Sequence, residues 1–260
     1  MERNAIPVVL IISATDPTGG AGMATDIRVC QRNGVYPTCC VTAITVQNQN
    51  GLTRIQSTVP QLIREQLEAI YEAVRPDAVK IGLLTSSYAV MTVADVLLKH
   101  RQRNIVMDPV LAPTRGGSFM DEPDAVMSDI ATFLFPQAEL VTPNAPEFEK
   151  YSELEVNGDI SWRQARNILL KGGHNNLNSG RCRDILFRVG KEIEIFESDR
   201  IESDNLHGTG CFLSSAIASW LARGYPLSKA IEQAKKDLSD EIRHSCHDRL
   251  IPGYGPVFTP

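Results

Sequence analysis

Short runs of consecutive apolar residues alternate along this chain with longer stretches in which apolar residues recur at helical spacing. Residues 7–13 (PVVLIIS) and 36–46, which are rich in β-branched residues, have the pattern of buried strands. Residues 60–74 (PQLIREQLEAIYEAV) instead place apolar residues three and four positions apart, which predicts an amphipathic helix. The pattern therefore predicts strands and helices in alternation.

The same patterns predict a full set of elements. Strands are expected at 7–13, 36–46, 78–81, 104–110, 139–142 and 168–171, with a hairpin made of 184–189 and 192–196. Helices are expected at 23–33, 60–74, 86–100, 124–135, 212–223 and 227–242. Since strands alternate with helices and no linker interrupts them, we expect one α/β domain over residues 1–260, with a mostly parallel sheet covered by helices on both faces in three layers.

Composition and charge narrow the class of protein. The formal net charge is −5 and no basic run occurs, which argues against a nucleic-acid-binding surface. No apolar segment is long enough to cross a bilayer and no cleavage site follows residues 7–13, so we expect a cytoplasmic protein with no membrane partner. The six cysteines form no CxxC pair and no metal-ligand spacing, so free thiols are expected.

Polar residues follow the predicted strands at their carboxyl ends. In open parallel sheets, ligands bind beyond this edge, so residues placed there by different strands form one site. The sequence places there Asp16, Gln47, Asp108, Asn144, Glu147, Lys171 and the glycine turn at 207–211.

The stretch HGTGC at 207–211 is the clearest candidate in this group. Gly208 and Gly210 precede a helix whose first backbone N–H groups have no partner within the helix, an arrangement that favours a phosphate or a phosphoryl group in transit. Cys211 falls in the first turn of that helix, where a thiol pKa can be lowered. Taken alone, the stretch also fits a tight turn followed by a buried cysteine.

Gln47 and Asp26 each admit two interpretations as well. The Gln47 amide suits recognition of a heterocycle because it offers a donor and an acceptor, but residues 47–51 also fit an ordinary polar turn. Asp26 lies one turn into the helix at 23–33. One interpretation places it in the site, near the mouth of the glycine turn at 18–22, and the other makes it only a charge that favours the start of a helix.

Seven stretches together resemble the ribokinase-like superfamily and, within it, the hydroxymethylpyrimidine/phosphomethylpyrimidine kinases of thiamin biosynthesis. They are DPTGGAG at 16–22, TVQN at 45–48, KIG at 80–82, MDPV at 107–110, TPNAPE at 142–147, KGGH at 171–174 and HGTGC at 207–211. Most sugar kinases of the superfamily carry Asp where this chain has Cys211, and the Cys is typical of the pyrimidine and pyridoxal branches.

The resemblance implies a ribokinase-like kinase, dimeric as in the family, that uses ATP and Mg²⁺ to phosphorylate 4-amino-5-hydroxymethyl-2-methylpyrimidine and its monophosphate. Cys211 would face the substrate hydroxymethyl group as a base or a positioning group. The anion hole for the transferred phosphoryl group would be formed by the amides of Gly208, Thr209, Gly210 and Cys211.

The resemblance also implies the two binding sites. The nucleotide would contact Asp108, Asn144, Glu147, Lys171 and Thr209. Asp108 and Glu147 would organise Mg²⁺, directly or through water. The pyrimidine pocket would be lined by Ala21, Asp26, Gln47 and Val110.

Departures from the family pattern keep other functions open. The family usually carries Gly at the position of Ala14 and Met at that of Leu83, and the loop at 112–117 has its own sequence with Arg115. A kinase of the same fold acting on pyridoxal or a related vitamer is therefore an alternative. A pyrimidine-binding module without catalysis is a third, against which the retained Asn144 and Glu147 argue.

Overall fold

The computed structural model describes residues 6–111, 119–120, 122–173, 180–245 and 255–257. The loop predicted at 112–117, with Arg115, and His174 of the KGGH stretch lie outside the described residues.

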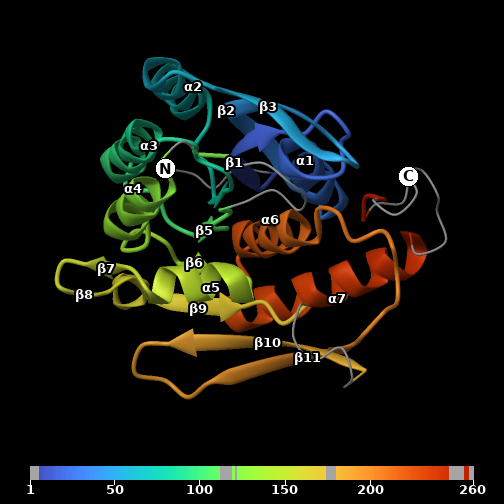
Figure 1. Ribbon diagram of the computed structural model, residues 1–260. Helices are drawn as coiled ribbons and strands as arrows, with labels where there is room; N and C mark the ends of the chain where they lie inside the picture. The colour runs from blue at the N-terminus through green and yellow to red at the C-terminus, as the bar shows by residue number, and fades with distance from the viewer. Residues whose placement is uncertain (1–5, 112–118, 121, 174–179, 246–254, 258–260) are drawn as a thin grey trace.

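One mixed sheet runs through the molecule (Figure 1). Its nine strands within the described residues are β1 (Val8–Thr15), β2 (Tyr36–Asn48), β3 (Gly51–Ser57), β4 (Ala78–Ile81), β5 (Ile105–Met107), β6 (Leu140–Val141), β9 (Asn167–Leu170), β10 (Arg181–Arg188) and β11 (Glu194–Asp199). The order is β11-β10-β9-β6-β5-β4-β1-β2-β3. Pairing is parallel from β9 through β6, β5, β4 and β1 to β2, and antiparallel at β3, β10 and β11.

Helices cover both faces of this sheet. One apolar core lies between the sheet and the helices α2 (Pro60–Ala73), α3 (Ser87–Lys99), α4 (Pro123–Asp129) and α5 (Ala145–Ser152). A second core lies on the opposite face under α1 (Gly22–Arg32), α6 (Thr209–Ala222) and α7 (Leu227–Ser245). Figure 1 shows α2, α3 and α4 together on the left of the view and α1, α6 and α7 together in its right half. The predicted α/β class with three layers is confirmed.

The local signals explain where several helices begin. The Ser86 hydroxyl accepts the N–H of Ala89 and caps α3, and Pro60 occupies the first turn of α2, where its missing N–H removes no helical bond. The predicted helix at 124–135 is α4 continued by a π-helical turn, Ile130–Leu134. No described helix is both long enough and apolar enough to span a membrane.

Two regions of the chain contain elements that the pattern did not predict. β3 returns antiparallel to β2 after a tight turn, so residues 47–48 belong to a strand, and only 49–50 form the turn. Between Glu147 and Lys171 the chain forms α5, the small hairpin of β7 (Glu155–Val156) and β8 (Asp159–Ile160), and a 3₁₀ turn, Ser161–Gln164. The parallel strands bring their carboxyl ends to one edge of the sheet, where the candidate residues gather.

Candidate functional site

The glycine turn after β1 is organised by the carboxylate of Asp16. Its Oδ1 accepts the N–H and the hydroxyl of Thr18, both at 2.9 Å, and its Oδ2 accepts the N–H of Ala21 at 3.1 Å. Burial alone would raise the pKa of Asp16, but the hydrogen bonds from His207 and Thr18 outweigh it and lower that pKa. Asp16 is therefore a carboxylate at neutral pH that fixes the backbone around Ala21.

The start of α6 leaves backbone donors exposed to a ligand. Gly208 has φ of 86°, a left-handed conformation that favours glycine. Thr209 directs both its N–H and its hydroxyl to the carbonyl of Leu206, at 3.3 and 3.0 Å. The N–H groups of Gly210 and Cys211 donate to no acceptor among the described residues. Two such donors at a helix N-terminus form a site suited to an anion.

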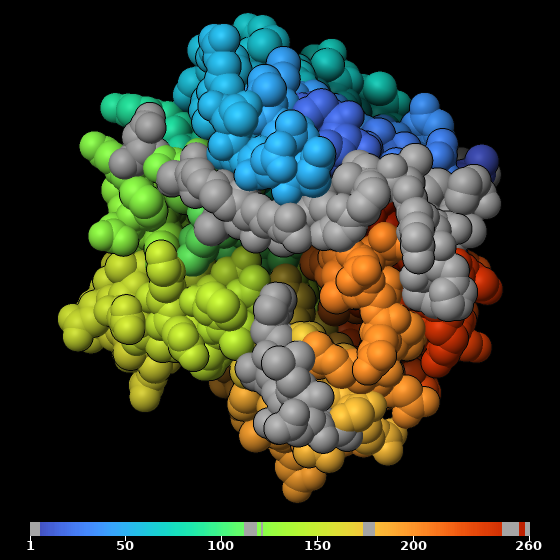
Figure 2. Space-filling view, turned by 45° about the vertical axis from the view of Figure 1, so that its right-hand side comes forward, coloured from blue at the N-terminus to red at the C-terminus, as the bar shows by residue number. Residues whose placement is uncertain are grey.

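A buried charge cluster lies directly beside these donors. Lys171 Nζ is 2.7 Å from Asp108 Oδ1 and 3.9 Å from Glu147 Oε2. A methyl group added at Gly210 would lie 3.4 Å from Lys171 Nζ and 3.9 Å from Asp108 Oδ2. The glycine turn, the end of β5 and the residue after β9 therefore meet at one place, and Figure 2 shows the surface hollowed between the yellow-green residues around α5 and the orange residues at the start of α6.

Asn144 and Glu147 hold this cluster through the start of α5. The Asn144 side chain accepts the N–H of Glu147 at 2.9 Å, while Glu147 Oε2 accepts the N–H of Asn144 at 2.7 Å, which is a capping box. Asn144 also pairs through its backbone with Lys171. This reciprocal cap thus holds the Glu147 carboxyl group 3.9 Å from the Lys171 ammonium.

The two acidic groups differ in protonation. Burial raises the pKa of Glu147 to about 7, with the charge of Asp108 adding to this and Lys171 opposing it. Burial also acts to raise the pKa of Asp108, but the ammonium groups of Lys171 and Lys80 prevail and lower it. No group of three or more His, Cys, Asp or Glu side chains in the described part of the chain is arranged to hold a metal ion. A cation at Asp108 and Glu147 would therefore need further oxygen ligands, which water and phosphate supply.

Asp26 does not lie at the mouth of the glycine turn, because its side chain is fully buried. Its Oδ2 is 2.7 Å from Lys80 Nζ, which is equally buried, and its Oδ1 accepts the Ser215 hydroxyl at 2.7 Å. A bound molecule cannot touch Asp26 in this conformation. The carboxylate instead joins α1, β4 and α6.

The expectation of a lowered thiol pKa at Cys211 is wrong. Burial raises the pKa of this thiol to about 11; Lys80 opposes the shift, and the carboxylates of Asp26 and Asp108 add to it. The backbone N–H of Gly22 is a further opposing influence. Desolvation therefore outweighs the favourable field of the helix N-terminus, and Cys211 carries its proton at neutral pH.

Gln47 and Val110 extend the same edge of the sheet. Gln47 is half-buried near the end of β2, opposite Leu52, and its amide makes no hydrogen bond within the described residues. Val110 is half-buried and donates its N–H to the carbonyl of Asp108 at 2.8 Å. Both lie at the carboxyl ends of their strands.

Three further residues that the sequence reasoning gave no role belong to this edge. Lys80 pairs with Asp26, Ser215 donates to Asp26, and the Ser214 hydroxyl lies 3.3 Å from Asp108 Oδ2. Lys80 had a readable signal, since it stands inside the apolar run AVKI of a predicted buried strand. A lysine at such a position is fully buried only when it is paired.

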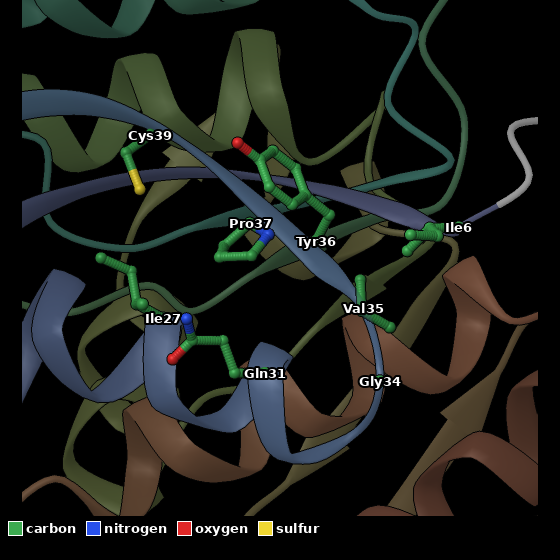
Figure 3. A pocket seen from close by; sticks show the side chains of 8 residues that line it. All are labelled: Ile6, Ile27, Gln31, Gly34, Val35, Tyr36, Pro37 and Cys39. Atoms are coloured by element: carbon green, nitrogen blue, oxygen red, sulfur yellow. The ribbon is translucent and has the colours of Figure 1, made fainter.

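A second hollow is not part of this site. It lies between α1 and the first residues of β2, where Ile27, Pro37 and Cys39 line it (Figure 3). It opens at the amino ends of β1 and β2, away from the edge where parallel sheets bind ligands. Its lining is mainly apolar and contains no acidic or basic side chain.

Comparison with known proteins supplies the family context. The family model for phosphomethylpyrimidine kinase matches residues 16–257. A bifunctional thiamine biosynthesis protein of Geobacter sulfurreducens is 38% identical over 96% of this chain, which spans only 51% of that protein's length. A hydroxymethylpyrimidine/phosphomethylpyrimidine kinase of Staphylococcus aureus strain Mu50 is 34% identical, with 96% of this chain and 92% of that protein covered.

A solved structure agrees with the fold. The ADP complex of Bacillus subtilis pyridoxal kinase superposes with a TM-score of 0.83 at 26% identity, covering 97% of this chain and 96% of that one. The match to the family model and to the two relatives confirms the resemblance carried by the seven sequence stretches.

Proposed function

Because this chain belongs to the phosphomethylpyrimidine kinase family, we propose that it phosphorylates 4-amino-5-hydroxymethyl-2-methylpyrimidine and its monophosphate with ATP. One observation carries the proposal. The two unpaired amides at the start of α6, those of Gly210 and Cys211, lie beside the charged groups of Lys171 and Asp108. Phosphoryl transfer depends chiefly on positioning and on neutralising charge, and these are the groups that supply both.

The nucleotide side of the site consists of Lys171, Thr209 and the acidic pair. Lys171 would place its ammonium along the phosphates. Within the anion hole expected at 208–211, the amides of Gly210 and Cys211 would receive the transferred group, because the Thr209 amide donates to Leu206. Asp108, kept ionised by Lys171, and Glu147, oriented by Asn144, are suited to hold Mg²⁺ directly or through water. When bound, Mg²⁺ would neutralise phosphate charge.

The acceptor side is formed by residues from the ends of β1, β2 and β5. Gln47 offers both edges of its amide to an aminopyrimidine, and Ala21 and Val110 would line the pocket. Cys211 keeps its proton near neutral pH, so we assign it to orient the substrate hydroxyl group rather than to remove the proton in the resting enzyme. Asp26 would act on this pocket indirectly, through Lys80 and Ser215.

The test is a coupled ADP-release assay with each pyrimidine, ATP and Mg²⁺. We expect ADP release that requires the pyrimidine and that falls at least 10²-fold in Lys171→Met, as for loss of one strong electrostatic donor. Lys99→Met is a matched control, because Lys99 pairs with Glu68 on the outer helices α2 and α3. No turnover with either pyrimidine would refute the proposal.

Pyridoxal is the second candidate acceptor, and the similarity to a pyridoxal kinase favours keeping it. Ala14 and Leu83, two of the departures from the family pattern, are both buried near the ends of β1 and β4. Competition between the pyrimidine and pyridoxal for one enzyme distinguishes the two. Binding of a pyrimidine without ATP affinity would instead support a module without catalysis.

The organisation of the whole protein is also a proposal. A single kinase domain over residues 1–260 is supported by one sheet shared by both apolar cores. A homodimer in the cytoplasm is supported by the family resemblance. Light scattering on the purified protein tests the dimer, and a mass of one chain, 28.6 kDa, would refute it.

A further inference from the structure

Three segments distant in the sequence meet at the start of α6. His207 donates its backbone N–H to the carbonyl of Gly255 at 3.3 Å, and Val257 donates its N–H to the carbonyl of His207 at 3.1 Å. Residues 255–257, at the C-terminal end of the chain, therefore pair with the residue that precedes the anion hole. The glycine turn after β1 is the third segment.

The contact between the two glycine turns leaves no room for side chains. A methyl group on Gly208 would lie 2.0 Å from the carbonyl oxygen of Gly20. A methyl group on Gly20 would lie 2.4 Å from His207 Cδ2 and 3.4 Å from Pro256 Cβ. Because these atoms are in direct contact, a displacement of one turn displaces the other.

One polar contact joins the same two turns. His207 Nε2 is 2.8 Å from Asp16 Oδ2, and both side chains are almost fully buried. The other contacts of the Asp16 carboxylate go to Thr18 and Ala21, on the acceptor side of the site. His207 directly precedes Gly208. Its contact with Asp16 therefore fixes the glycine turn after β1 (residues 16–22, here called the acceptor turn) relative to the start of the anion hole at 208–211.

We propose that His207 is a positioning residue: with Asp16, and held in turn by residues 255–257, it sets the distance between the acceptor turn and the anion hole. The role in transfer rests on the proposed kinase function. Phosphoryl transfer needs the attacking oxygen and the phosphorus in near-contact, and a misplacement of about 1 Å costs about 10²-fold in rate. Neither residue touches the reacting atoms in this account.

The first experiment measures kcat and both KM values for His207→Ala and His207→Gln. In the His207→Ala variant we expect kcat to fall about 10²-fold, while the KM values for ATP and pyrimidine stay within about threefold of those of the wild type. In Gln, whose amide nitrogen reaches the place of Nε2 and can donate to Asp16, we expect at least tenfold recovery of kcat over Ala. His100→Ala is the control, since His100, directly after α3, places Nε2 2.9 Å from Glu68 Oε2 of α2 in a more exposed histidine–carboxylate pair remote in sequence from both glycine turns.

A second experiment tests the coupling of the two turns without using activity. Amide hydrogen exchange is followed in the ligand-free variants for residues 16–22 and 206–211. We expect His207→Ala to accelerate exchange in both segments and His100→Ala to accelerate it in neither. Acceleration in only one segment would overturn the proposal, whether or not the wild-type protein turns over a pyrimidine.

The outcomes also separate this proposal from the kinase function. If the wild type is inactive with every acceptor and the exchange result holds, the kinase function fails and the coupling of the turns stands. If the wild type is active and His207→Ala keeps kcat within threefold, the positioning role is wrong. If Ala does not fold, Gln decides: a folded Gln variant with less than a tenth of the wild-type kcat overturns the role.

Discussion

The buried ion pair of Lys80 and Asp26 gives the sharpest prediction about stability. Both side chains have 0% exposed surface, and Lys80 Nζ lies 2.7 Å from Asp26 Oδ2. Breaking a buried pair by removing one partner costs about 3–5 kcal/mol, because the other charge stays buried without compensation. Lys80→Met is therefore expected to lower the free energy of unfolding by that amount, out of a total of about 5–15 kcal/mol.

Urea unfolding at fixed pH measures the loss. With an m-value of about 3 kcal/mol/M, the midpoint should fall by about 1–1.7 M. Asp26→Asn removes the other partner while its amide oxygen still accepts from Ser215, and it should cost a similar amount. The double variant should lose less than the sum of the two, because neither buried charge remains.

The pH dependence of the two single variants should have opposite signs. Without Lys80, burial raises the folded-state pKa of Asp26, so stability is complete below the unfolded-state pKa and is lost as pH rises through the folded one. Without Asp26, Lys80 loses its main compensating charge and burial depresses its folded-state pKa, so stability is lost as pH falls through that pKa. The deficit of Lys80→Met should thus be larger at pH 8 than at pH 5, and that of Asp26→Asn larger at pH 6 than at pH 9.

Three results would refute this reasoning: a loss below about 1 kcal/mol in Lys80→Met, the size of an exposed pair; additive losses in the double variant; or pH trends of the same sign. Arg64→Met is a suitable control, because Arg64 pairs with an exposed Asp95 at 2.8 Å and should cost less than about 1 kcal/mol.

Three further predictions concern the site. Burial raises the pKa of Cys211 to about 11, so its alkylation by iodoacetamide at pH 8 should be about 10²-fold slower than that of a free cysteine; an equal rate would contradict the burial argument. Burial raises the pKa of Glu147 to about 7, so the contribution of this one group to stability is complete below its unfolded-state pKa and is lost as pH rises to about 7. Glu147→Gln should therefore recover up to about 3 kcal/mol at pH 8 and lose most activity; unchanged stability in urea would count against it. Gly208→Ala forces a methyl group to within 2.0 Å of the Gly20 carbonyl oxygen, and should cost more than about 2 kcal/mol, since strain adds to overpacking; a wild-type melting temperature would show that the turns are not in such contact.

Hydrophobic pattern alone predicts most of the fold because parallel strands are buried on both faces and their helices on one. The apolar run at 7–13 and the helical spacing at 60–74 are direct consequences of those two environments. β3 escapes prediction because Thr53, Arg54 and Gln56 are polar, as an exposed edge strand allows. The hydrophobic pattern does not predict α5, because eight residues contain too few turns to show a helical repeat of apolar positions. Its capping box is nevertheless readable in the stretch NAPE.

The site is predictable in its location but not in its internal pairing. That strand ends converge follows from parallel topology, and it brings Asp108 and Lys171 together across 63 positions. Which lysine joins which carboxylate depends on tertiary packing, so the sequence gives no sign that Lys80 joins Asp26. The pKa of Cys211 is likewise not predictable from the sequence. Its place at a helix start can be read locally, whereas its desolvation depends on every residue packed around it.

Charge balance connects these findings to the reaction. At the sheet edge two ammonium groups, Lys80 and Lys171, face the carboxyl groups of Asp26, Asp108 and Glu147. With Glu147 protonated the cluster is neutral, and with Glu147 ionised it carries one negative charge, so neither state attracts a polyphosphate by net charge. Lys171 is already engaged by Asp108 in the ligand-free protein. If Asp108 and Glu147 turn to a divalent cation, the ammonium of Lys171 is released toward the phosphates, and because the Glu147 pKa lies near 7, that exchange should also release a proton near neutral pH. Under the proposed kinase function, phosphate binding beside these acidic residues would therefore be coupled to the binding of a cation.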